Sequence, residues 1–131
     1  MIFLAGLIAL SVGAAIVSGM VLYTETSRKT ETQADAITRG DWRAGKQVVT
    51  RYNCGSCHKI SGIDGASGMV GPDLADIGKR VTIAGSLPND PETMVRWLMH
   101  PQQLHPGSGM PEMGLTEKEA RDAAAFLYAK Q

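Results

Sequence analysis

The chain has little of several kinds of residue, and each shortage narrows what it can be. It contains only two cysteines among 131 residues, and aromatic residues make up 5% of it. A domain of fewer than about 100 residues has a marginal apolar core by surface-to-volume scaling. With so few aromatic side chains, a large apolar group bound at the centre would supply the missing burial.

Net charge is lacking as well, because 13 basic residues balance 13 acidic ones. With this balance, neither a basic patch for nucleic acid nor an acidic field that would steer a charged partner can be claimed. The dinucleotide fingerprint, the phosphate-binding loop and internal repeats are also missing. No segment of useful length alternates apolar and polar residues as a strand does, and the glycine-rich residues 61–71 are typical of a loop. We therefore expect an all-α protein without a nucleic-acid partner.

The one long apolar run lies at residues 2–23, which carry no charge and no proline. An α-helix of about 20 residues spans a bilayer. A cleaved signal peptide is the alternative, with a small-residue cleavage site at residues 12–14. Such a peptide begins with basic residues and has a shorter apolar run. We therefore expect residues 1–23 to be an uncleaved transmembrane anchor that meets the membrane through residues 2–23.

Residues 24–38 are polar and contain neither glycine nor proline, so they are expected to tether the anchor to the rest of the chain. The tether either extends the anchor helix or lies loose. As a helix it would lift the following domain roughly 20 Å, at about 1.5 Å per residue. The globular domain is then residues 39–131.

Residues 54–58 read CGSCH and contain both cysteines of the chain. Cys54 and Cys57 with His58 directly after them form the haem-attachment signature of c-type cytochromes, where two thioether bonds hold one porphyrin edge. A thioredoxin-like redox pair expects a βαβ context. A structural zinc site needs about four protein ligands, and only His100 and His105 remain. We predict one covalent haem c, attached through Cys54 and Cys57, with His58 as an axial iron ligand.

Three segments have helical periodicity. Residues 41–53 place small or apolar side chains at helical spacing and lead directly into the CGSCH motif. Residues 91–100 begin with a proline after possible capping residues and end before Pro101. The last helix begins at Thr116 with a capping box and continues through several alanines that permit close approach of another helix.

The order helix, CXXCH, loop, helix, methionine loop and final helix resembles class I cytochrome c, from about residue 41 to residue 130. The resemblance implies a small cytochrome c fold around one haem. It also implies that the first and last helices of the domain cross closely, at Gly45 on one and Phe126 on the other.

The sixth iron ligand decides whether the haem only carries electrons or also binds and reacts with a small molecule such as peroxide. Met110 lies in the sequence HPGSGMP, and the resemblance places the methionine ligand in a loop of this kind before the last helix. Met113, Met69 and His105 are the rivals. Met113 is read as packing, Met69 would have to displace its own loop, and an exposed loop histidine is commoner than a ligand.

Four further residues receive roles from the same resemblance. Pro72 corresponds to the proline whose carbonyl holds the second nitrogen of the haem-ligating imidazole. Arg80 and Ser108 correspond to residues that contact the haem propionates, and Trp97 lines the methionine side. Arg80 and Ser108 are also common surface residues, and that alternative stays open.

With both axial positions filled, dioxygen, peroxide or another small-molecule substrate has no place at the iron, so the resemblance implies a single-electron carrier and not an enzyme. We expect a membrane-anchored cytochrome that passes electrons from a quinol-oxidising complex to a terminal oxidase or reductase of the respiratory chain. One alternative is a permanent haem subunit of a respiratory complex. Another is a haem sensor or peroxidase with a labile methionine ligand.

Haem is attached to such motifs outside the cytoplasm. The resemblance therefore implies the bacterial inner (cytoplasmic) membrane, with the haem domain on the periplasmic side. Arg28 and Lys29 follow the apolar run, and the positive-inside rule favours the reverse orientation. We give precedence to the chemistry of haem attachment.

Overall fold

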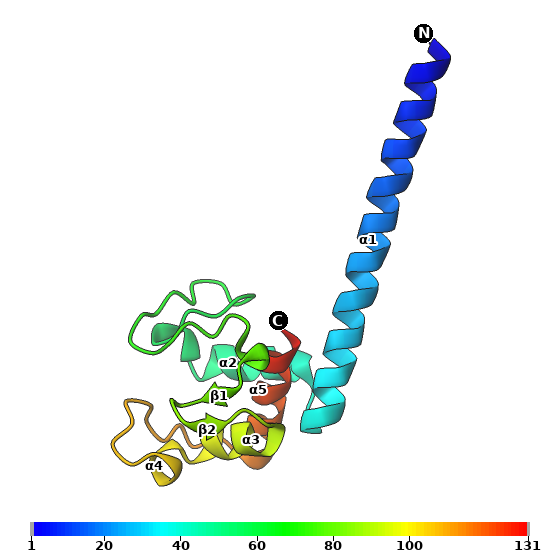
Figure 1. Ribbon diagram of the computed structural model, residues 1–131. Coiled ribbons are helices and arrows are strands. Elements are labelled where there is room, and N and C mark those ends of the chain that lie inside the picture. Colours follow the sequence, from blue (N-terminus) through cyan, green and yellow to red (C-terminus); the bar gives the residue numbers. More distant parts are fainter. Residues whose placement is uncertain (1, 131) are drawn as a thin grey trace.

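The computed structural model describes residues 2–130, so Met1 and Gln131, the outer ends of the expected anchor and domain, lie outside the described residues. Helices make up 61% of the structure and strands 5%, which confirms the all-α class. Figure 1 shows one long helix that projects from a cluster of shorter elements. The elements in chain order are α1 (Ile2–Thr38), α2 (Trp42–Arg51), η1 (Cys54–Ser56), η2 (Ile77–Lys79), β1 (Thr82–Ile83), β2 (Leu87–Pro88), α3 (Pro91–Met99), α4 (Pro101–Leu104) and α5 (Glu117–Ala129).

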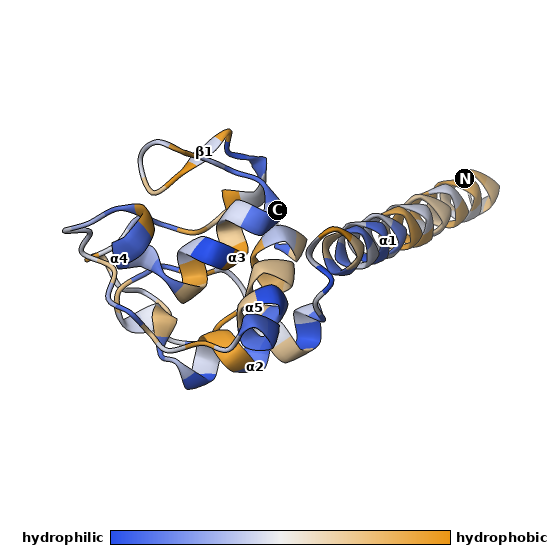
Figure 2. Ribbon diagram, turned by 90° about the horizontal axis from the view of Figure 1, so that it is seen from below, coloured by the Kyte–Doolittle hydropathy of each residue, from blue (hydrophilic) through white to orange (hydrophobic). Residues whose placement is uncertain are grey.

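Helix α1 runs without a break through the apolar run and the polar residues 24–38. Its large apolar side chains are exposed along the run from Phe3, at 91%, to Tyr23, and the least exposed of them is Val21 at 52%. Figure 2 shows the hydrophobic colours gathered toward the N-terminal end of the helix. By length and composition, α1 is the one helix among the described residues that could cross a membrane. The segment after residue 23 is thus helical, while the domain boundaries at residues 23 and 38 stay predictions.

The C-terminal turns of α1 pack against α5. Ala34 is 2% exposed and Thr38 is fully buried. The guanidinium of Arg121 donates a hydrogen bond to the Thr38 carbonyl at 3.1 Å, and the Trp42 N–H donates to Asp35 Oδ1 at 2.7 Å. These contacts fix the end of α1 on the rest of the domain.

The helix starts predicted from capping residues are confirmed. Asp90 accepts a hydrogen bond from the Thr93 N–H at 2.9 Å, and Pro91 occupies the first turn of α3. Thr116 and Glu119 form the complete capping box of α5, because each side chain bonds the backbone N–H of the other at 3.3 and 2.9 Å. Both caps satisfy N–H groups that would otherwise lack a partner at the helix start.

The expected close crossing of the first and last domain helices is also present, between α2 and α5. Gly45 lies against the backbone carbonyl of Asp122 and the Cβ of Phe126. Phe126 is fully buried, as are Ala120 and Ala124. The small residues on both helices let the two backbones approach until only a hydrogen fits at position 45.

Two local features were missed by sequence reasoning. β1 and β2 form a two-residue antiparallel hairpin, with Thr82 opposite Pro88, although no strand was expected. The hairpin turns at Ala84 and Gly85, which have φ values of 49° and 85°, and a strand this short leaves no alternation to detect. Pro101 does more than end a helix: it begins the separate short helix α4.

Candidate functional site

The CGSCH motif follows directly from the end of α2. Asn53 adopts the left-handed conformation, with φ of 53°, and turns the chain into η1. The N–H of Cys57 donates to the Cys54 carbonyl at 3.3 Å, and the N–H of His58 donates to the same carbonyl at 3.0 Å. One tight turn therefore holds both thiols and the imidazole, and the two thiols are not joined to each other.

The His58 ring is held by the loop that follows it. Its Nδ1 lies 2.8 Å from the carbonyl oxygen of Pro72. A carbonyl only accepts, so Nδ1 carries the proton and Nε2 keeps a lone pair for a metal. Gly71 lies against the same ring, where an added Cβ would be 2.3 Å from Cε1 and 2.6 Å from Nδ1.

Backbone hydrogen bonds close this loop over the motif. The Gly71 N–H donates to the Cys57 carbonyl at 2.8 Å, and the Gly68 N–H donates to the Gly55 carbonyl at 3.1 Å. A Cβ on Gly68 would lie 2.4 Å from the Ser56 carbonyl oxygen. The glycines of the segment thus let the loop cross the motif at backbone contact distance.

Arg80 lies over the residues that follow Pro72. Its guanidinium donates to the Asp73 carbonyl and, at 3.2 Å, to the Ala75 carbonyl. These bonds hold the segment whose proline carbonyl contacts His58, and the expected contact of Arg80 with a propionate stays a prediction. Trp97, on α3, is partly buried against the core, and its expected place beside the haem stays a prediction as well.

The Met110 segment is tied at several points. Ser108 Oγ accepts a hydrogen bond from the Met110 N–H at 3.1 Å, and Gln102 Nε2 donates to the Met110 carbonyl at 2.7 Å. Met110 and Met113 are both partly buried against the core, whereas Met69 is 93% exposed. Among the three methionines, Met110 is the one whose backbone is fixed by neighbouring side chains on both its N–H and its carbonyl.

Sequence reasoning missed two polar residues that organise this region. Gln102 bonds the Met110 segment, and the amide of Asn89 donates to the carbonyls of Ile77 and Arg80 at 2.7 and 2.8 Å. Asn89 Oδ1 accepts from the Tyr128 hydroxyl at 2.7 Å. Neither residue belongs to a recognisable motif, so no signal in the sequence points to them.

The other uses of the cysteine pair do not fit the structure. Burial raises the pKa of the Cys54 thiol above its ordinary value, whereas a reactive redox cysteine has a lowered pKa. Among residues 2–130 no group of three or more metal-binding side chains of the His, Cys, Asp and Glu types is assembled. Neither a thioredoxin-like pair nor a closed zinc site is supported.

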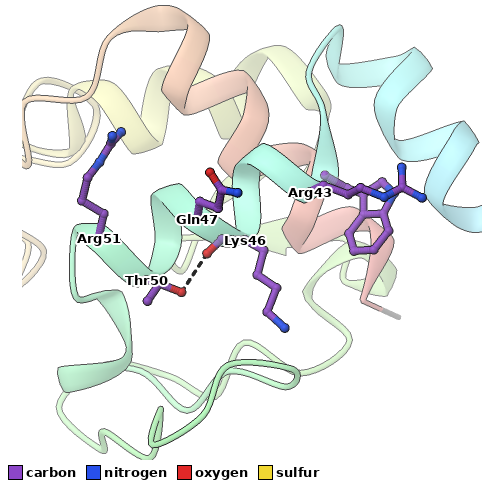
Figure 3. A pocket seen from close by; sticks show the side chains of 6 residues that line it. Arg43, Lys46, Gln47, Thr50 and Arg51 are labelled. Carbon is purple, nitrogen blue, oxygen red and sulfur yellow. Dashed lines mark hydrogen bonds between the residues drawn. The ribbon is translucent and has the colours of Figure 1, made fainter.

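A surface hollow with a volume of about 530 Å³ lies elsewhere, along α2 (Figure 3). It is lined by Trp42, Arg43, Lys46, Gln47, Thr50 and Arg51. The hollow includes none of the predicted site residues, and it is open to the surface. We place the chemistry at the CGSCH turn and the Met110 segment, where the donor atoms are.

The residues of this region fit a covalently bound haem. Two thiols and a metal-binding imidazole share one turn, and the imidazole is oriented through its second nitrogen. A loop that carries the thioether side chain of Met110 precedes the last helix. This combination on a small helical domain defines a c-type haem protein.

The chain belongs to the cytochrome c family, because the family model described as Cytochrome c matches residues 42–129. Cys54 and Cys57 fit the CXXCH motif of that family, and membership implies covalently attached haem c and a role in electron transport.

Three curated relatives match part of the chain, and each is a cytochrome c oxidase subunit 2. The relative from Alkalihalophilus pseudofirmus is 33% identical over 84 residues, which are 63% of this chain and 24% of the relative. The relative from a Bacillus species is 33% identical over 60% of this chain and 26% of its own length. The relative from Bacillus subtilis is 30% identical over 67% of this chain and 25% of its own length. The chain therefore spans about a quarter of the length of these relatives. No solved structure matches.

Proposed function

We propose that this protein is a membrane-anchored monohaem cytochrome c that relays single electrons from a quinol-oxidising complex to a terminal oxidase. In this proposal His58 Nε2 and the Met110 sulfur would hold the haem iron, and Cys54 and Cys57 would carry the thioether links to the porphyrin. The bound haem supplies a one-electron redox couple. The similarity to oxidase subunits supports a respiratory context.

The observation that carries the proposal is that the protein itself fixes both ligand-bearing segments. His58 is held through Nδ1 by Pro72 at 2.8 Å, and the Met110 backbone is held at its N–H and its carbonyl. Ligands that are held before the iron changes charge do not rearrange when it does. A low cost of reorganisation favours electron transfer over binding of an exogenous ligand.

A nitrogen ligand opposite a thioether raises the reduction potential relative to two imidazoles. Both positions are then filled, which leaves no coordination site for dioxygen or peroxide. The sensing or peroxidase alternative requires that the Met110 sulfur leave the iron readily.

The test is carbon monoxide binding to the ferrous holoprotein at neutral pH. The wild-type protein and a Met113→Ala variant should bind carbon monoxide slowly and incompletely, while Met110→Ala should bind it rapidly. Rapid and complete binding by the wild type would overturn the electron-carrier proposal in favour of sensing. Rapid binding by Met113→Ala alone would overturn the choice of Met110.

A second candidate is a permanent haem subunit of a respiratory complex, and one feature of the fold favours it. The last turns of α1 are fixed on the domain through Ala34, Thr38 and the pair of Glu31 with Lys130, whose charged atoms are 3.8 Å apart. The haem domain then cannot swing freely on a loose tether. Isolation of the complex in mild detergent separates the two candidates: a subunit stays in constant ratio to the oxidase after a salt wash, and a mobile carrier is lost.

We also propose that residues 2–23 lie in the bacterial inner membrane and that the haem domain faces the periplasm. The exposed apolar side chains of α1 support membrane insertion. Protease added to spheroplasts should digest the haem domain of the intact protein. Protection of the domain until the membrane is opened would contradict this orientation.

A further inference from the structure

The Met110 segment is held by one side chain from the short helix α4. Gln102 Nε2 donates to the carbonyl of Ser108 at 2.8 Å and to the carbonyl of Met110 at 2.7 Å. Gln102 Oε1 accepts from the N–H of Gly107 at 3.2 Å. We call this set of three hydrogen bonds the Gln102 clamp.

The chemistry of the clamp requires a neutral amide. Its nitrogen faces two carbonyl oxygens, which only accept, and its oxygen faces an N–H group, which only donates. A primary amide alone among the common side chains offers two donors and one acceptor at its tip in this arrangement. Glutamate would place oxygens against carbonyls, and alanine would leave three backbone groups to find other partners.

The clamp is itself anchored in the fold. The backbone N–H of Gln102 donates to Glu112 Oε1 at 3.1 Å. Pro101, directly before it, is among the most completely buried side chains of the described chain. Residue 102 is therefore fixed on the domain, and it bonds residues on both sides of Met110 as well as Met110 itself.

Local bonds within the segment do not replace the clamp. Ser108 Oγ accepts from the Met110 N–H at 3.1 Å, and the Ser108 N–H donates to the His105 carbonyl at 3.1 Å. Both bonds join residues of the same loop, so they shape the loop without fixing it on the domain. The clamp ties the loop to α4 directly before and at Met110, and the bond of the Gln102 N–H to Glu112 ties it to α4 after Met110.

We propose that Gln102 is a positioning residue, whose amide holds the loop so that the Met110 sulfur stays on the haem iron in both oxidation states. This inference rests on the proposed function, because it takes Met110 as the axial ligand. Loss of the clamp lets the loop open more often, and each opening exposes the sixth coordination position. The expected effect is on the lifetime of the sulfur–iron bond and not on haem attachment.

The experiment uses the full-length holoprotein in detergent with the variants Gln102→Ala and Gln102→Glu. Gln103→Ala is the matched control, since Gln103 is its exposed neighbour on the same short helix. The readouts are the sulfur-to-iron charge-transfer absorption of the ferric protein and the rate at which added imidazole binds ferric haem. Imidazole must wait for the sulfur to leave, so its rate reports opening of the loop.

Both Gln102 variants should bind imidazole at least about tenfold faster than wild type, because the net loss of even one hydrogen bond corresponds to roughly a decade in an opening equilibrium, and the variants lose three bonds (Ala) or two (Glu). Gln103→Ala should stay within about twofold of the wild-type rate. Gln102→Glu keeps an acceptor for the Gly107 N–H while it replaces the two donors by an oxygen that faces both carbonyls, and it provides a second test if Gln102→Ala folds poorly.

A Gln102→Ala or Gln102→Glu protein with wild-type rate and absorption overturns the proposal, even if its thermal stability is lowered. That result would leave a structural role only. A Met110→Ala variant tests separately whether Met110 is the iron ligand, on which the role of Gln102 depends. If this variant retains the charge-transfer absorption, Met110 is not the ligand, and both the proposed ligand pair and the role of Gln102 are wrong.

Discussion

Gly45 of α2 lies directly against the carbonyl of Asp122 in α5, so that a Cβ on residue 45 would be 1.9 Å from that oxygen. The same Cβ would be 2.9 Å from the Cβ of Phe126, which is fully buried. The two helices that bracket the haem motif in sequence are therefore held at backbone contact. Position 45 admits no side chain without separating them.

Gly45→Ala should destabilise the domain by about 3 kcal/mol, at the upper end of the usual cost of overpacking. The obstacle is backbone, which cannot turn away as a flexible side chain does. Thermal unfolding of the holoprotein measures the effect. Gly19→Ala is the matched control, since it makes the same change in a helix where nothing lies within 4 Å, and equal stability of the two variants would contradict the prediction.

Gly71→Ala should disturb the imidazole of His58, because the new Cβ would lie 2.3 Å from the ring carbon Cε1. A displaced ring loses the hydrogen bond from Nδ1 to the Pro72 carbonyl, which makes the imidazole a weaker base and favours the ferrous state. The reduction potential should therefore rise, by about 60 mV for each tenfold increase in the stability of the ferrous state relative to the ferric state.

Potentiometric titration of the full-length protein measures this shift. Ser67→Ala, on an exposed position of the same loop, serves as the control and should leave the potential unchanged. A Gly71→Ala protein with the wild-type potential would show that the Pro72 contact does not tune the haem.

Tyr128 should make the stability of the domain depend on alkaline pH. Desolvation by burial, with the charge of Asp90 as a smaller cause, raises its pKa from 10.0 to about 12. The folded state therefore keeps the proton that the unfolded state releases, so this contribution is complete below pH 10 and is lost as pH rises toward 12.

Tyr128→Phe supplies the comparison. At neutral pH it should be less stable than wild type by about 1 kcal/mol, since the hydroxyl donates to Asn89 Oδ1 at 2.7 Å. The difference should shrink between pH 10 and 12, where only the wild type has a hydroxyl to ionise. Denaturant unfolding across this pH range measures the difference, with Tyr23→Phe as an exposed control. A difference that stays constant would contradict the pKa assignment.

Glu92 should control how firmly α1 is held on the domain. Its carboxylate accepts from Arg39 Nη2 at 2.6 Å and from Arg121 Nη1 at 3.1 Å, and the hydrogen bonds from Arg121 and then Arg39 lower its pKa. Glu92→Ala should speed tryptic cleavage after Arg39 about two- to fivefold, the size expected for exposed ion pairs.

The control for this variant is Glu117→Ala, because Glu117 pairs with Arg121 and leaves the bond of Glu92 to Arg39 in place. It should change the cleavage rate much less than Glu92→Ala. Since the lowered pKa means that the ion pairs persist above the ordinary value of 4.5 and weaken as pH falls below it, wild-type cleavage by an acid-stable protease should also rise in acid. No increase in either experiment would mean that packing alone fixes α1.

Much of the domain was predictable because its signals are local. The helices at residues 41–53 and 91–100 and the capping box at Thr116 are present, with ends that differ by one or two residues. Capping and periodicity depend on residues within a turn or two of each other, so a sequence reveals them directly. The CXXCH motif is local in the same sense, and the family comparison agrees with it.

The parts that were not predictable depend on residues distant in sequence or on very short elements. The hairpin of β1 and β2 has two residues in each strand, which is too few for a pattern. The bond of Asn89 to Tyr128 joins residues 39 positions apart. The roles of Arg80, Trp97 and Ser108 toward the haem remain predictions, as does the axial role of Met110.

By itself the sequence determined the haem attachment at Cys54 and Cys57, the apolar run at residues 2–23 and the positions of the domain helices, because spacing along the chain specifies each of these. The contact of the Pro72 carbonyl with His58 was expected from the family resemblance and is present at 2.8 Å. Only the tertiary structure decided that the polar residues 24–38 continue the apolar helix and pack against α5, that Gly71 lies against the His58 ring, and that Gln102 clamps the Met110 loop. These are contacts between separate segments. They arise when packing brings side chains and backbone groups together, and no local pattern of residues encodes which partner each will meet.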